Sequence, residues 1–116
     1  MNLNKYTEKA REAVLSAQQL AVEMTHTQIE PEHLLAMLTE QPDGIVPALL
    51  NKLDVRPQDL ATAVRAELAR SPKAHGGSQP NLSPRLQAVA DRAQGEASRL
   101  KDDFVSTEHL LLAVAS

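Results

Sequence analysis

Apolar positions recur at three- and four-residue steps along most of this chain, which is the spacing of one face of an α-helix. The first stripe consists mostly of small side chains and predicts a helix of about five turns, which we expect Thr7 to cap. Because small side chains let another backbone come close, we expect this helix to lie centrally. The stripe is Ala10, Ala13, Val14, Ala17, Ala21 and Met24.

Three more helices are predicted before residue 71. Pro31 and Pro57 each suit the first position of a helix, where a missing amide costs nothing, and the turn signal at 41–44 separates a short helix between them. Residues 25–28 break the helical pattern and predict a loop. We expect the buried faces of these helices to be Leu34, Leu35, Met37 and Leu38, then Ile45, Val46, Leu49, Leu50 and Leu53, and last Leu60, Val64 and Leu68.

Residues 71–82 contain prolines, the Gly76–Gly77 pair and small polar residues, which predict a linker that is mobile near that pair. After the linker, Ser83 restarts the helical scheme as a cap. The new apolar stripe is Leu86, Val89, Ala90, Ala93, Ala97 and Leu100. Gly95 falls on the polar side of this helix, Phe104 and Val105 are expected to anchor the following loop, and Ser106 should cap the last helix.

The stretch Glu32-His33-Leu34-Leu35 returns 76 residues later as Glu108-His109-Leu110-Leu111. The same offset runs without insertion from Thr7 to about Leu38, which indicates a duplicated structural unit. Repeat one spans 1–70, the linker 71–82 and a partial repeat two 83–116, all within one domain. Two helices follow the Glu-His-Leu-Leu helix in repeat one and have no counterpart in repeat two. We expect repeat two to be truncated; the alternative is that something outside the chain closes it. The predicted fold is all-α, with about six helices.

Bulk composition changes this picture little. Hydrophobic residues make up 42% of the chain, yet Tyr6 and Phe104 are its only aromatic residues, so alanine and leucine must carry the packing. The net charge of −3 is spread along the chain, and no basic block points to nucleic acid or an anionic membrane. The longest apolar run, 110–115, is far shorter than the roughly twenty residues of a membrane span. With no cysteine and a polar amino terminus, the sequence predicts a cytoplasmic protein.

No motif for chemistry emerges. The chain lacks the Gly-Lys-Ser/Thr of a phosphate-binding loop, the helical zinc pair His-Glu-x-x-His and any nucleophile signature. His33 and His109 are instead expected to hydrogen-bond the preceding loop or helix. We therefore predict no catalytic residue, no cofactor site and no metal site in this chain.

Binding is the function that remains, in a groove where the two repeats meet. Tyr6, Leu86 and Ala90 are candidates for its apolar lining, with burial in the core as the alternative for each. A polar rim is expected from Thr7, Asp102 and Glu108, for which a helix cap or a solvated acid is the alternative.

These residues also carry a resemblance. The opening Met1-Asn2-Leu3-Asn4-Lys5-Tyr6-Thr7 resembles the start of disaggregases of the Clp B type. The two copies, Ile29-Glu30-Pro31-Glu32-His33-Leu34-Leu35 and Val105-Ser106-Thr107-Glu108-His109-Leu110-Leu111, are similar to the Clp amino-terminal repeat of the Clp/Hsp100 AAA+ family. The resemblance covers essentially the whole chain.

It implies an all-helical domain of two pseudo-symmetric four-helix repeats, here without the last two helices. The implied parent is a homohexameric ATPase that works with a DnaK-type chaperone system, with ATP and magnesium bound only in its ATPase modules. This domain would receive unfolded or aggregated proteins through exposed apolar segments, at Thr7, Asp102 and Glu108 with Tyr6, Leu86 and Ala90 beside them. The alternatives are an adaptor-docking domain of a Clp A or Clp C type unfoldase that feeds a protease, and a stand-alone helical repeat protein.

Overall fold

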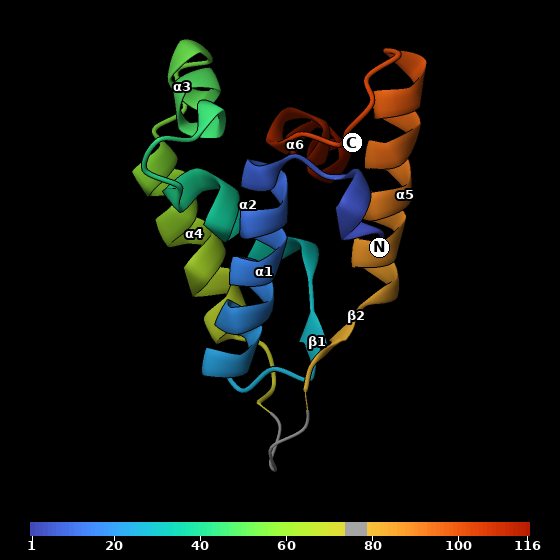
Figure 1. The fold of residues 1–116 in the computed structure, drawn as a ribbon. Coiled ribbons are helices and arrows are strands. Elements are labelled where there is room, and N and C mark those ends of the chain that lie inside the picture. The colour runs from blue at the N-terminus through green and yellow to red at the C-terminus, as the bar shows by residue number, and fades with distance from the viewer. Residues whose placement is uncertain (74–78) are drawn as a thin grey trace.

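The computed structural model describes residues 1–73 and 79–116, and the described residues form six α-helices (Figure 1). Gly76 and Gly77 lie outside the described residues. The described residues also form two strands of two residues each and one short 3-10 helix, η1. The elements are η1 (Leu3–Lys5), α1 (Glu8–Glu23), β1 (Gln28–Ile29), α2 (Pro31–Glu40), α3 (Ile45–Lys52), α4 (Pro57–Ala69), β2 (Asn81–Leu82), α5 (Pro84–Arg99) and α6 (Thr107–Ala115).

The helices pack in two equivalent pairs, α1 with α2 and α5 with α6. α4 lies along α2 at one side of the molecule, whereas α5 lies at the other (Figure 1). The predicted stripe of small side chains is confirmed, because Ala10, Ala13 and Ala21 are fully buried in the core, as Ala93 and Ala97 are in α5. Alanine at these positions allows the close approach of neighbouring helices.

The two repeats are joined by two short, reciprocal backbone contacts. In the first, β1 pairs with β2 in parallel, with Ile29 opposite Leu82. In the second, Tyr6 forms a parallel bridge with Val105. The 76-residue offset converts one contact into the other. In each contact, the segment before the first helix of one repeat pairs with the segment before the second helix of the other. We call the β1–β2 pairing the first clasp and the Tyr6–Val105 bridge the second clasp.

The clasps correct two predictions. Gln28 was expected in a loop and Leu82 in the linker, but both lie in the strands of the first clasp. A strand of two residues has no periodicity in the sequence, and its pairing partner is more than fifty residues away. Only the folded arrangement of the repeats creates it.

Several apolar side chains predicted to point inward are exposed. Ile45 begins α3 and Leu53 follows its last residue; they are 47% and 70% exposed, because this two-turn helix reaches the core only through Val46 and Leu50. Leu100 is 49% exposed, since α5 ends just before it. Phe104 is 50% exposed while Val105 is fully buried, because successive side chains of extended backbone point in opposite directions.

Candidate functional site at the seam between the repeats

The first helix of each repeat ends in the same way. Thr25 and Lys101 both adopt left-handed backbone conformations, with φ of 56° and 60°. The next amide then turns back onto its helix, as the His26 N–H donates to the Ala21 carbonyl over 2.9 Å. The equivalent bond from Asp102 closes the end of α5. These matching turns deliver the side chains of His26 and Asp102 to equivalent positions.

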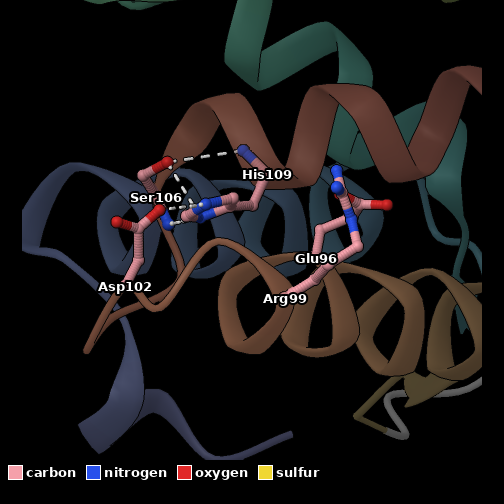
Figure 2. A network of polar contacts seen from close by, with 5 residues as sticks. All are labelled: Glu96, Arg99, Asp102, Ser106 and His109. Carbon is pink, nitrogen blue, oxygen red and sulfur yellow. Dashed lines mark hydrogen bonds and ion pairs between the residues drawn. The ribbon is translucent and has the colours of Figure 1, made fainter.

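In repeat two, Asp102 meets the histidine of the Glu-His-Leu-Leu motif (Figure 2). Nε2 of His109 lies 2.9 Å from Oδ2 of Asp102, and the Ser106 N–H donates to Nδ1 of His109 over 2.9 Å. Because Nδ1 accepts a hydrogen bond, the ring proton is on Nε2 and points at the carboxylate. The loop and the helix start are thereby tied together.

Repeat one places a second histidine where repeat two has the aspartate. The Glu30 N–H donates to Nδ1 of His33 over 2.8 Å, and Nε2 of His33 lies 2.8 Å from Nδ1 of His26. Burial and the neighbouring His26 lower the pKa of His33 below its usual value. The prediction that both motif histidines hydrogen-bond the preceding loop or helix is confirmed.

The three apolar residues predicted to line the groove belong to the core. Tyr6, Leu86 and Ala90 are 5%, 1% and 5% exposed. Burial, together with the carboxylate of Asp91, raises the pKa of the Tyr6 hydroxyl. In this conformation these side chains pack in the core and present almost no surface to a partner.

The three predicted polar residues lie around the second clasp. The Thr7 N–H donates to the Val105 carbonyl over 2.9 Å, and the Thr7 hydroxyl caps α1 by accepting from the Ala10 N–H. Asp102 and Glu108 are three residues before and three after Val105, and both are exposed. The structure gives Thr7 a cap role and Asp102 a histidine contact, and it leaves Glu108 exposed at the start of α6.

The sequence prediction missed the exposed apolar side chains beside this rim. Leu100 and Phe104 are half exposed and flank Asp102 in the loop between α5 and α6. The alternation of Phe104 with Val105 ahead of a helix cap was the available signal, since only one of two adjacent residues in extended backbone faces the core.

The first clasp carries an apolar hollow of about 380 Å³. Its walls come from the amino terminus, α1 and both strands of the clasp. Among the described residues, the six predicted site residues are absent from its walls. The lining residues are Met1, Leu3, Val14, Gln18, Ile29, Pro80, Asn81 and Leu82.

A larger hollow of about 600 Å³ lies away from the seam, among α2, α3 and α4. Three prolines and the ion pair between Arg65 and Glu40, 2.7 Å at its shortest, form part of its wall. We do not place the site here, because the walls mix prolines with an ion pair and include no apolar side chain of the seam.

Residues 1–73 and 79–116 contain no cluster of three or more side chains suited to hold a metal ion. None of the helices in that part of the chain is long and apolar enough to cross a bilayer.

Comparison with known proteins places the chain among amino-terminal domains. Residues 5–116 match the Clp repeat (R) N-terminal domain family. The chaperone protein ClpB of Nitratidesulfovibrio vulgaris is 40% identical over 114 residues, which cover 95% of this chain. The chain spans 13% of the length of that relative.

Solved structures share the fold. The Hsp104 N-terminal domain from Candida albicans has a TM-score of 0.86 at 23% identity, over 95% of this chain and 73% of that chain. A ClpV N-domain in complex with a VipB peptide has a TM-score of 0.82 at 20% identity, over 96% of this chain and 68% of that chain. At these identities the two structures show likeness of fold alone.

Proposed function

The chain belongs to the Clp repeat N-terminal domain family, and from this membership we propose that it is the substrate-recognition domain of an ATP-dependent protein disaggregase. The observation that carries the proposal is 40% identity to a ClpB chaperone across 95% of the chain. Its substrates are the exposed apolar segments of unfolded or aggregated proteins. The motor lies in other modules of a homohexameric parent, which bind ATP and magnesium and cooperate with a DnaK-type chaperone system.

The proposed binding surface surrounds the second clasp and consists of Thr7, Leu100, Asp102, Phe104 and Glu108. Half-exposed Leu100 and Phe104 supply apolar area to a ligand. The carboxylates of Asp102 and Glu108 stand beside that area and repel acidic segments. A surface of this kind suits extended segments that combine apolar with basic residues. Tyr6, Leu86 and Ala90 contribute indirectly, because their packing in the core fixes how the two repeats meet.

An NMR titration with a permanently unfolded, apolar-rich protein tests this proposal. We expect weak binding that does not depend on nucleotide, with chemical shift changes around Thr7, Phe104 and Glu108. Phe104→Ser should weaken binding about fivefold, because it removes the half-exposed ring from the contact. Leu53→Ser is the matched control, since Leu53 is 70% exposed at the end of α3 and its loss should leave binding unchanged.

Shift changes confined to the hollow at the first clasp would move the site to that hollow and keep the function. Absence of binding to any unfolded protein would contradict the function itself.

A further inference from the structure

The two repeats have different side chains at one equivalent contact. His26 and Asp102 follow identical helix ends, and each reaches the motif histidine of its own repeat. His26 and His33 are 6% and 0% exposed, so repeat one buries two titratable rings side by side. Repeat two pairs its histidine with a carboxylate that is half exposed.

The hydrogen bonds of repeat one assign the protons on both rings. Nδ1 of His33 accepts from the Glu30 N–H, so the His33 proton is on Nε2. That proton is donated to Nδ1 of His26, which places the His26 proton on Nε2. Each ring then has one unprotonated nitrogen, and an N–H group already points at it.

A further proton therefore has no free nitrogen in this pair. Protonation of Nδ1 of His33 sets it against the Glu30 N–H and breaks the contact that closes the start of α2. Protonation of Nδ1 of His26 sets two donors face to face over 2.8 Å. Repeat two shares the backbone donor, since the Ser106 N–H also points at Nδ1 of His109. It differs in two acceptors: Asp102 accepts from Nε2 of His109, and the Ser106 hydroxyl oxygen lies 3.1 Å from Nδ1.

The surrounding charges oppose each other. Burial and His26 disfavour an imidazolium at His33, whereas the nearby carboxylates favour it, and the net effect is a lowered pKa. Arg85 of α5 forms ion pairs with the same carboxylates, at 2.8 Å from Glu32 and 3.7 Å from Glu30. This positive charge reduces the stabilisation that the carboxylates give to an imidazolium at His33. The titratable groups that act on His33 are His26, Glu30 and Glu32. Glu67 of α4 and Arg85 of α5 line a hollow together with Glu30 and Glu32.

The His26 loop leads directly into the first clasp. The carbonyl of Thr27 accepts from the Asn81 N–H over 3.2 Å, and the carbonyl of Ile29 accepts from the Ser83 N–H over 3.1 Å. We propose that the His26–His33 pair is a proton-sensitive latch, which keeps the first clasp closed near neutral pH and releases it in mild acid while the second clasp stays closed.

The direction of the pH dependence follows from proton linkage. At a pH well above the ordinary imidazole pKa of about 6.5, His33 is unprotonated in folded and unfolded chains, so the latch contributes its full stability. As pH falls below that value, the open form takes up protons that the closed form resists. Because the pKa of His33 is lowered in the closed form, the opening equilibrium then rises by up to about tenfold per pH unit.

Hydrogen exchange of wild-type protein tests the latch, with the second clasp as internal control. Between pH 7.5 and 5.5, protection factors of the Asn81 and Ser83 amides should fall about tenfold relative to those of Thr7 and Val105. Nitrogen NMR of the imidazoles at pH 7.5 should show both protons on Nε2. Equal loss of protection in the two clasps, or loss in neither, would overturn the proposal.

An exchange of residues between the repeats provides matched variants. His26→Asp installs the repeat-two arrangement and should abolish the acid sensitivity of the first clasp. Asp102→His should confer acid sensitivity on Thr7 and Val105. If His26→Asp fails to fold, the wild-type exchange experiment decides alone; a folded His26→Asp variant with unchanged acid sensitivity would refute the latch.

Discussion

Thr7 in repeat one donates its backbone N–H to the carbonyl oxygen of Val105 in repeat two, over 2.9 Å. The equivalent bond, from Ser83 to Ile29, is 3.1 Å long. Both donors also cap a helix with their hydroxyl groups. In each repeat, one residue therefore caps a helix with its hydroxyl group and donates a backbone hydrogen bond to the other repeat.

The cap function of Thr7 is separable from its place on the binding surface. Thr7→Ala should lower the free energy of unfolding by about 1 kcal/mol, because the Ala10 amide loses its acceptor while the backbone bond to Val105 remains. Thr7→Ser keeps the hydroxyl and should recover most of this loss. Urea denaturation measures both, and equal destabilisation by the two variants would show that the cap is not the reason.

Gly95 offers a stabilising substitution. It lies on the exposed side of α5, and an added Cβ would meet nothing within 4 Å. Gly95→Ala should raise the free energy of unfolding by about 0.5–1 kcal/mol, since alanine loses less backbone entropy in a helix. Gly44→Ala is the control, because its Cβ would stand 3.0 Å from Cβ of Gln41. Thermal unfolding that ranks the two variants the other way would contradict this account.

The left-handed backbone conformation of Lys101 predicts a second substitution that raises the free energy of unfolding. A non-glycine residue at φ of 60° is strained, so Lys101→Gly should stabilise the chain by about 0.5–1 kcal/mol. Lys52→Gly, the same substitution at the last residue of α3, should instead cost up to about 1 kcal/mol, the penalty for glycine in a helix. Chemical denaturation curves of the two variants against wild type test the pair.

The small buried side chains of α5 predict that a larger side chain at these positions lowers the stability of the domain. Ala93 is fully buried, so Ala93→Leu should destabilise the domain by about 1–3 kcal/mol or prevent folding. Ala48→Leu, on the exposed side of α3, should change stability by less than about 0.5 kcal/mol. Melting temperatures compare them, and a tolerated leucine at 93 would mean that close helix approach is not what the alanines provide.

The site was only partly legible in the sequence. Thr7, Asp102 and Glu108 were predicted because the 76-residue offset marks helix starts and the loop between helices, and as binding residues they stay a prediction. Tyr6, Leu86 and Ala90 were offered with burial as the alternative, and they lie in the core. Apolar character does not reveal whether a side chain faces a groove or the interior, and for Phe104 that choice depends on which neighbour fills the space.

What the sequence determined by itself was the set of helices, their caps and the duplication. These follow from local causes: apolar spacing, hydroxyl caps at Thr7, Ser83 and Ser106, and a fixed offset between Glu32 and Glu108. The tertiary structure alone decided the two clasps, the exposure of Phe104 and the contrast between His26 and Asp102. Each of these depends on groups that are distant in the chain, or on side chains that meet only when the turns after α1 and α5 are formed, and no local pattern encodes such a meeting.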